Sequence, residues 1–197
     1  MFKMLPESFF EKLKEKVKKE VGEKGSHDIG HIERVYKLSI LISKDLNVDM
    51  DVIRAAALFH DIAKHKEKKK KKDHAMMGAK EALKILKRTE FPKEKLKIVE
   101  KCILLHNKSE DIPEIKEIRV LKEADGLESM GAIGIARHFA YNGDEEDWNN
   151  SNVLNELTRN LNLNYFKLPI AKEYAQRRIA ITQSFCTEFK KEFNLTI

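Results

Sequence analysis

Apolar residues recur three and four positions apart along most of this 197-residue chain, and this spacing constrains the fold more than any other feature. Phe10, Leu13 and Val17 show it near the start, and it returns in a longer series after His31. Such a period gathers apolar side chains on one face of an α-helix, whereas a half-buried strand requires strict alternation. Only 8 Gly and 4 Pro interrupt the chain. The sequence therefore predicts an all-α protein of about seven to nine helices.

Turn and cap residues within this pattern set the helix boundaries. Asp73 is typical of an N-cap, and Pro92 is favoured in the first turn of a helix. The polar stretch 142–152 is predicted to form a loop. The predicted helices cover residues 7–21, 28–46, 52–64, 73–88, 92–106, 115–127, 130–141 and 168–193.

Positive charge is concentrated in one run of lysines. The formal net charge is +6, and Lys68–Lys72 contributes five of these charges. A protein that binds a long polyanion usually spreads Lys and Arg along a face, so we do not expect nucleic acid as a partner. A local cluster can attract a phosphorylated small molecule. A solvated loop is the alternative, which we favour for the run taken alone.

Cysteine usage and hydropathy indicate the compartment. Cys102 and Cys186 lie inside apolar helical patterns, as is typical of a reduced protein. No apolar run approaches the roughly 20 residues that a membrane-spanning helix needs, and the first residues lack a signal-peptide pattern. We therefore expect a cytoplasmic protein with no membrane partner, and we keep a homodimer as an open alternative.

An adjacent histidine and aspartate, His60 and Asp61, follow the apolar run 55–59. A carboxylate is costly to bury on such a segment unless a cation or several hydrogen bonds compensate it. A divalent metal ion would satisfy both residues at once. A hydrogen-bonded His–Asp pair that only ends the helix is the competing interpretation, and the pair alone does not decide between them.

Two further polar residues repeat this anomaly. His31 shares a helix face with Val35 and Leu38, and Asp125 lies among apolar residues of another predicted helix. One inward-facing histidine is more often a core residue than a ligand. Two His and two Asp on three apolar helices, however, form a suitable nitrogen and oxygen set for one octahedral metal ion. Such a set favours manganese, magnesium, nickel, iron or cobalt over a thiolate-type structural zinc.

The order of these residues resembles the HD-domain metal-dependent phosphohydrolases, a superfamily named after its His-Asp pair. The stretch 27–35 (HDIGHIERV) holds the first His, 58–64 (LFHDIAK) the pair, and 123–137 (EADGLESMGAIGIAR) the last Asp. The third stretch resembles a small branch that acts on nucleotides, with Glu123 where that branch often has Asp. The likeness covers nearly the whole chain.

The resemblance implies an all-helical fold around one divalent metal ion. The implied metal ligands are His31, His60, Asp61 and Asp125. It also implies an N-terminal helix over residues 1–25, an HD-type metal-binding core over 26–141, and a helical extension over 142–197 packed on the same domain.

The resemblance further implies hydrolysis of a phosphate ester or anhydride, so we expect a small anionic phosphorylated substrate, most simply a nucleotide. The metal would acidify a bound water and polarise the phosphoryl group, and Asp61 is of the right kind to steer that water. Lys64 and Arg34 are candidates to stabilise the developing charge, with Arg137 a weaker one. For each cation, a surface or structural salt bridge is the alternative.

Four more polar residues flank the implied ligands. His74 and His106 could bind a second metal ion, contact phosphate or protonate the leaving group, or they could be polar residues at helix ends. We favour one metal ion, with these two histidines on the substrate side. We expect His27 and Asp28 to support the ligands from behind.

Two other functions compete with hydrolysis of phosphates. His27 and His31 imitate the His-Glu-x-x-His motif of zinc peptidases with Asp28 in place of Glu. That motif needs a continuous helix, which a helix start at His27 breaks, and it leaves His60 and Asp61 unexplained. The second competitor is a non-catalytic helical nucleotide- or nucleic-acid-binding module with a structural metal. The lysine run supports it weakly, since it lacks aromatic residues that could stack on bases.

Overall fold

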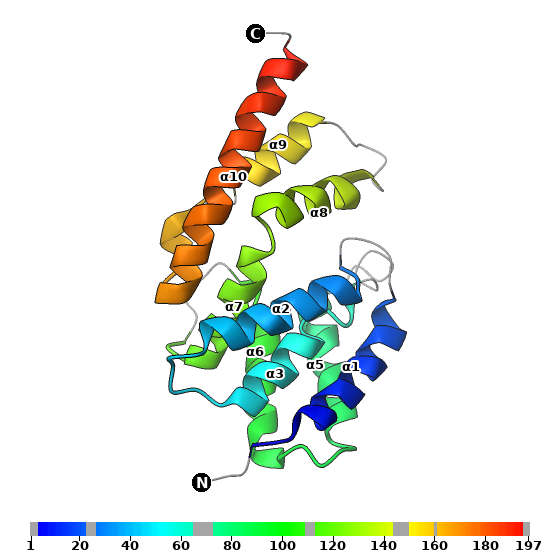
Figure 1. The fold of residues 1–197 in the computed structure, drawn as a ribbon. Helices are drawn as coiled ribbons and strands as arrows, with labels where there is room; N and C mark the ends of the chain where they lie inside the picture. Colours follow the sequence, from blue (N-terminus) through cyan, green and yellow to red (C-terminus); the bar gives the residue numbers. More distant parts are fainter. Residues whose placement is uncertain are drawn as a thin grey trace. The chain divides into compact units, whose positions relative to one another are not determined.

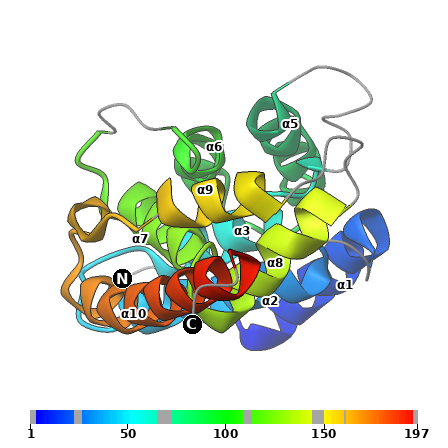
Figure 2. The same cartoon turned by 90° about the horizontal axis from the view of Figure 1, so that it is seen from above.

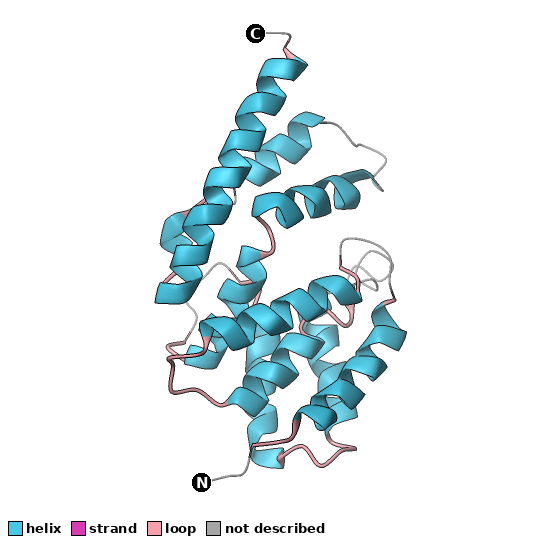
Figure 3. Ribbon diagram, in the orientation of Figure 1, coloured by secondary structure: helices cyan, strands magenta, loops and turns pink. Residues whose placement is uncertain are grey.

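The computed structural model describes residues 4–22, 27–64, 73–108, 113–143, 150–159 and 161–194. Within these residues every regular element is a helix and no strand occurs, which confirms the predicted all-α class (Figure 1, Figure 3). The chain divides into two compact units, Met1–Ala124 and Asp125–Ile197. Each unit is described by itself.

Nine α-helices and two short 3-10 helices form the described part of the chain. The first unit contains α1 (Glu7–Val21), α2 (Ile29–Ile42), α3 (Met50–Phe59), α5 (His74–Leu86), η1 (Lys93–Lys95) and α6 (Leu96–Leu105). The division between the units falls inside α7 (Lys116–Leu127). The second unit contains α8 (Gly131–Gly143), α9 (Asn150–Arg159), η2 (Leu163–Tyr165) and α10 (Pro169–Phe193). None of the described helices combines the length and apolarity that a membrane crossing requires.

Aspartate side chains begin three helices of the first unit. Asp28 accepts a hydrogen bond from the backbone amide of His31 at 2.9 Å and so caps α2. Asp49 and Asp73 accept bonds in the same way at the first turns of α3 and α5. These caps satisfy amides that have no partner within their own helix. The cap predicted at Asp73 is confirmed.

Helix α3 is central to the first unit. It packs against α1, α2, α5 and α6, and the apolar run 55–59 is fully buried. Figure 2 shows α3 between α2 and α6. His60 and Asp61 follow this run directly, so the burial of α3 carries both polar side chains into the interior. The hydrophobic core thus positions the pair that the sequence singles out.

An ion-pair cluster fixes the opposite end of α3. Lys95 Nζ in η1 lies 2.7 Å from a carboxylate oxygen of the buried Asp51 and 2.9 Å from one of Asp49. The backbone amide of Leu5 donates to the other Asp51 oxygen at 3.0 Å. Burial alone would lower the pKa of Lys95, but its hydrogen bonds to both aspartates raise that pKa overall. The cluster joins the segment before α1, the start of α3 and η1.

The second unit is built around the packing of α8, α9 and α10 on one another. Val153, Leu157 and Cys186 are buried at their centre. Part of the predicted loop 142–152 is helical, because residues 142–143 complete α8 and 150–152 begin α9; residues 144–149 lie outside the described residues. Burial of apolar side chains against α8 and α10 outweighs the weak helix propensity of the asparagines in α9.

Candidate metal centre

His31 enters the interior of the first unit from the first turn of α2. The Asp28 cap fixes this turn through the His31 amide. The His31 side chain is fully buried, on the helix face that also buries Val35 and Leu38. The sequence expectation that His31 points inward is confirmed.

His60 ends α3 with one ring nitrogen bonded to its own helix. Its Nδ1 lies 2.8 Å from the carbonyl oxygen of Ala57. A carbonyl only accepts hydrogen bonds, so Nδ1 carries the ring proton and Nε2 presents its lone pair. This Nε2 lies 3.2 Å from Nε2 of His31. An imidazole held in this way is oriented as a metal ligand.

His106 repeats the arrangement at the end of α6. Its Nδ1 lies 2.7 Å from the carbonyl oxygen of Ile103, three residues earlier. The lone pair is therefore on Nε2, which lies 3.6 Å from Oδ1 of Asp61. Helices α3 and α6 thus end on the same local motif, and each presents an imidazole nitrogen to the interior.

Asp61 lies between two groups of histidines. Its Oδ2 atom lies 3.6 Å from Nε2 of His31 and 3.7 Å from Nε2 of His60. Its Oδ1 atom lies 3.5 Å from Nε2 of His74 and 3.6 Å from Nε2 of His106. The ligand atoms of Asp61, His74 and His106 all lie within 4.8 Å of one another. One carboxylate therefore faces two sets of imidazole nitrogens.

Five imidazole rings form a continuous row past this carboxylate. Adjacent ring centroids are 5.6, 5.2, 5.3 and 5.6 Å apart, each in edge-to-face contact, in the order His27, His31, His60, His106 and His74. His27 lies in the turn before α2, and its Nε2 is 3.9 Å from Asp61 Oδ2. The row places nitrogen donors from four segments of the first unit around one anion.

The neighbours of Asp61 set its protonation state. Burial alone would raise its pKa, because it disfavours the charged carboxylate. The electrostatic interaction with His60 and the close approach of the His106 and His31 rings, each 3.6 Å away, outweigh burial and hold the pKa of Asp61 well below its ordinary value. Asp61 is therefore an anion at neutral pH, as a carboxylate ligand has to be.

His74, the first residue of α5, carries its proton on the other nitrogen. Its Nδ1 lies 3.4 Å from Nζ of Lys64, and an ammonium group only donates hydrogen bonds. The charged ammonium at Nδ1 and the anionic Oδ1 of Asp61 at Nε2 both favour a lone pair on Nδ1 and the proton on Nε2, and they outweigh the neutral amide nitrogen of Asn107 that also faces Nε2 at 3.3 Å. His74 thus presents a proton to the carboxylate, where His60 and His106 present lone pairs.

Asn107 is a neighbour of this site that the sequence analysis missed. It directly follows His106, and its amide nitrogen lies 3.3 Å from Nε2 of His74. The available signal was a second polar residue at the end of the apolar helix α6. The predicted residues that the first unit gathers around Asp61 are His27, His31, His60, Lys64, His74 and His106.

Arg34 lies one turn after His31 on α2, close to the helix start. A Cβ atom at Gly30 would stand 3.2 Å from Nη1 of Arg34 and 3.2 Å from Oδ1 of Asp28. The missing side chain at Gly30 therefore leaves room for the guanidinium beside the cap of α2. Asp28 is linked to His31 by this cap, since the amide that it holds belongs to His31.

Two predicted residues belong to the second unit. Asp125 is its first residue and lies half-buried on α7. Arg137 lies on α8, where its Nη1 donates a hydrogen bond of 2.9 Å to the backbone carbonyl of Glu128. This contact gives Arg137 a structural role within its own unit. The lysine run Lys68–Lys72 lies outside the described residues.

Comparison with known proteins points to one family. A family model described as HD domain matches residues 28–130, more than half of the chain. A solved HD-superfamily hydrolase from Bacillus thuringiensis is 29% identical, with 95% of this chain and 98% of that chain covered and a TM-score of 0.72. A structure described as a predicted HD superfamily hydrolase from an uncultured Thermotogales bacterium is 25% identical. It covers 93% of this chain and 92% of its own chain, with a TM-score of 0.69.

A third solved structure shares the fold at lower identity. YpgQ from Bacillus subtilis, in complex with ADP, is 23% identical, with 93% of this chain and 97% of that chain covered and a TM-score of 0.73. Among curated proteins, none matches this chain.

Proposed function

Because this chain belongs to the HD-domain family, we propose that it is a metal-dependent phosphohydrolase that cleaves a phosphate ester or anhydride. The relatives named as HD-superfamily hydrolases support a hydrolytic reaction. The observation that carries the proposal is the environment of Asp61, a buried anion with imidazole nitrogens facing both of its oxygens. A buried carboxylate is costly in a purely structural core, whereas a divalent cation would compensate it.

The proposed metal ligands in the first unit are His31, His60 and Asp61. Two nitrogens that each lie about 2.1 Å from an ion, at right angles, are separated by about 3.0 Å. The 3.2 Å between Nε2 of His31 and Nε2 of His60 matches that separation. Imidazole with carboxylate suits manganese, magnesium, nickel, iron or cobalt. These residues therefore fit the metal that the family implies.

Asp125 is the proposed fourth ligand. It lies three and four residues after Lys122 and Leu121 on α7, and both of these side chains are buried. Residues at these spacings share one helix face, so Asp125 continues a buried face of α7. The resemblance of the stretch 123–137 to the last Asp block of the family supports the same assignment.

One metal ion is proposed, on the Oδ2 side of Asp61. On the Oδ1 side, His106 presents a lone pair, but His74 presents a proton because Lys64 faces its Nδ1. This second set would have to change the tautomer of His74 before it could hold an ion. His74 and His106 are therefore proposed as groups on the substrate side.

The residues of the chain take separate roles in the proposed reaction. A divalent ion held by these residues would supply Lewis acidity, which would lower the pKa of a water and polarise a phosphoryl oxygen. Asp61 accepts a hydrogen bond from the attacking water and so orients it. Lys64 and Arg34 place positive charge beside the phosphoryl group. His74 can donate a hydrogen bond from its Nε2 to the leaving oxygen and so stabilise the charge that develops there.

A nucleotide is the proposed class of substrate. YpgQ, which shares the fold, was solved in complex with ADP. Lys64, which lies 3.4 Å from His74, and Arg34, which lies one turn after His31 on α2, suit a phosphate chain, since Arg and Lys are the usual protein partners of phosphate oxygens. Both observations support a nucleoside phosphate over an uncharged substrate.

A release assay tests the proposal. Phosphate and pyrophosphate release is measured over nucleoside mono-, di- and triphosphates, after metal-stripped protein is supplied with Mn²⁺, Mg²⁺, Ni²⁺, Co²⁺ or Fe²⁺ in turn. We expect turnover with at least one combination of metal ion and nucleotide. The variant His60→Ala should lose this turnover. The control variant Lys84→Gln, at an exposed position of α5, should retain it. Nucleotide binding without turnover under every metal would favour the non-catalytic binding module.

A further inference from the structure

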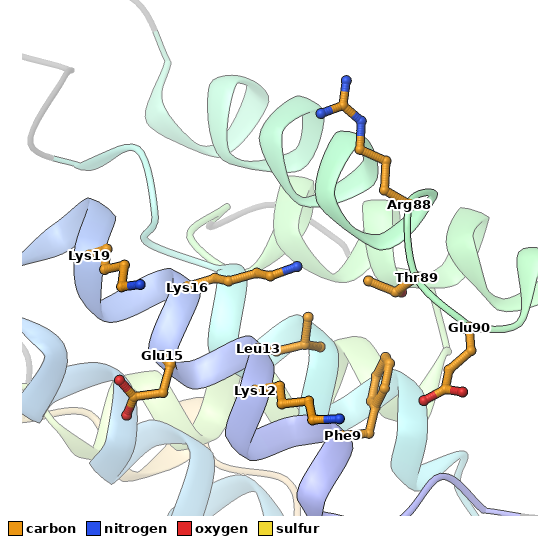
Figure 4. A pocket seen from close by; sticks show the side chains of 9 residues that line it. All are labelled: Phe9, Lys12, Leu13, Glu15, Lys16, Lys19, Arg88, Thr89 and Glu90. Atoms are coloured by element: carbon orange, nitrogen blue, oxygen red, sulfur yellow. The ribbon is translucent and has the colours of Figure 1, made fainter.

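A pocket of about 580 Å³ lies in the first unit between α1 and the turn that follows α5 (Figure 4). None of the residues that line it belongs to the group around Asp61. His74 begins α5, whereas Arg88 of the pocket follows its end, 14 positions later. At 1.5 Å per helical residue this separation is about 20 Å. The pocket is therefore distinct from the candidate metal centre.

Four cations line this pocket. Lys12, Lys16 and Lys19 come from one face of α1, and Arg88 comes from the turn after α5. In the described part of the chain, no ion pair joins any of the four to a carboxylate. Lys14, which lies on another side of α1, is by contrast paired with Glu11 at 2.9 Å. Like charges three and four residues apart weaken a helix, and a bound anion would relieve that repulsion.

The floor of the pocket is apolar and firmly packed. Phe9 is 6% exposed and Leu13 is 2% exposed. The Phe9 ring stacks on Phe91 at 6.3 Å and meets Phe10 edge to face at 5.3 Å, so its position is fixed by two aromatic neighbours. An apolar floor beneath a set of cations suits a ligand that is both anionic and partly apolar.

The wall opposite α1 is preformed by Thr89. Its hydroxyl donates to the carbonyl of Leu86 at 2.7 Å and accepts from the amide of Phe91 at 3.2 Å, which fixes the turn after α5. Figure 4 shows Lys16 extending across the pocket toward Thr89, while the carboxylate of Glu15 points away from it. Lys16 is therefore the lysine of α1 that reaches across the pocket toward the opposite wall.

We propose that this pocket binds a small organic phosphate, with its apolar part against Phe9 and Leu13 and its phosphate beside Lys12 and Lys16. The volume lies within the usual range of small-molecule sites. The phosphate is not hydrolysed there, because no residue of the histidine row lines the pocket. This binding does not depend on the proposed hydrolase activity.

The test follows 4-fluorophenyl phosphate by fluorine NMR, with the full chain in EDTA so that no metal supports turnover. We expect saturable binding, at least about threefold weaker in the double variant Lys12→Gln and Lys16→Gln. Lys84→Gln, which removes an exposed lysine of α5 outside the pocket, should bind as the unmodified chain does. His60→Ala should also bind unchanged, because the probe does not occupy the metal centre.

Inorganic phosphate as a competitor tests the apolar floor. We expect it to displace the probe at least about tenfold less effectively than phenyl phosphate does, because it cannot use Phe9 and Leu13. Equal competition by inorganic phosphate would reduce the pocket to a non-specific basic surface and overturn the proposal. An unchanged affinity in the double lysine variant, a loss of binding in His60→Ala, or no binding at millimolar probe would also overturn it.

Discussion

The Nε2 atoms of His31 and His60 lie 3.2 Å apart, although the residues are 29 positions apart in the sequence and belong to different helices. The carbonyl of Ala57 keeps the proton of His60 on Nδ1, so a lone pair of His60 faces the other ring. Two ring nitrogens repel at this distance unless a proton or a cation lies between their lone pairs. The first unit thus brings together two ring nitrogens that either a proton or a metal ion can bridge.

Asp61→Asn should abolish metal binding with little loss of helix. The amide keeps the shape of the side chain but removes the negative charge between the two histidine groups. We expect binding of Mn²⁺ to weaken by at least about 100-fold, measured by titration calorimetry. Asp45→Asn, at an exposed position on the same unit, is the control and should bind normally. Retained Mn²⁺ affinity in Asp61→Asn would remove Asp61 from the ligand set.

Asp125→Ala should also abolish metal binding while the protein stays helical. Loss of one charged ligand of four weakens the site, whereas a long helical core tolerates one change at a half-buried position. Circular dichroism combined with a metal titration distinguishes the two effects. Unfolding of the variant would show that Asp125 has a structural role first.

Lys64→Met should move the ring proton of His74 from Nε2 to Nδ1. The ammonium of Lys64 now faces Nδ1 at 3.4 Å, and without it the described contacts no longer hold the lone pair there. Imidazole nitrogen shifts in two-bond ¹H–¹⁵N spectra report the tautomer directly. His60, whose Nδ1 bonds to Ala57, is an internal control and should not change. A proton already on Nδ1 of His74 in the unmodified chain would contradict this assignment.

Lys95→Met should lower the free energy of unfolding by about 3 kcal/mol, because it leaves the buried carboxylate of Asp51 without its cation. Chemical denaturation at neutral pH measures the change. Lys97→Met, at an exposed neighbouring position, should change stability by less than about 0.5 kcal/mol. Equal losses in both variants would show that the ion-pair cluster does not stabilise α3.

The stabilisation from Lys95 should depend on pH in one direction. Its pKa is raised in the folded chain, so this stability is fully present below the unfolded value of about 10.4. It is lost as the pH rises through the folded pKa, where the ammonium gives up its proton. The difference between the unmodified chain and Lys95→Met should therefore be constant from pH 7 to 9 and shrink above about pH 10.4. A difference that grows above that pH would contradict the assignment.

The helices of the first unit were predictable because each carries its own local signals. The apolar period gave α1, α2 and α3, and the carboxylate of Asp73 marked the start of α5. Helix α9 was missed because its asparagines are typical of loops. Its apolar residues favour a helix only because they pack against α8 and α10, which the sequence does not reveal. Local propensity is informative where it agrees with packing, and packing decides where the two disagree.

The candidate site was predictable to the extent that its residues look anomalous in their own segments. His60 and Asp61 stand out beside an apolar run, and His31 stands out on an apolar face. Asn107 stands out as a polar residue at the end of α6, but its partner His74 cannot be read from that segment, because the contact joins residues 33 positions apart. The tautomer of His74 could not be predicted from the sequence either, since it depends on the position of Lys64 in the folded chain.

The bonds from Nδ1 of His60 and His106 to carbonyls three residues earlier have a consequence for the order of events as the protein matures. Each ring is oriented by its own helix end, so it adopts its position when that helix forms. No ion is needed to arrange these two side chains. Metal loading and chain folding can then occur as separate steps, and the speed of loading should depend on how fast the ion releases its water shell.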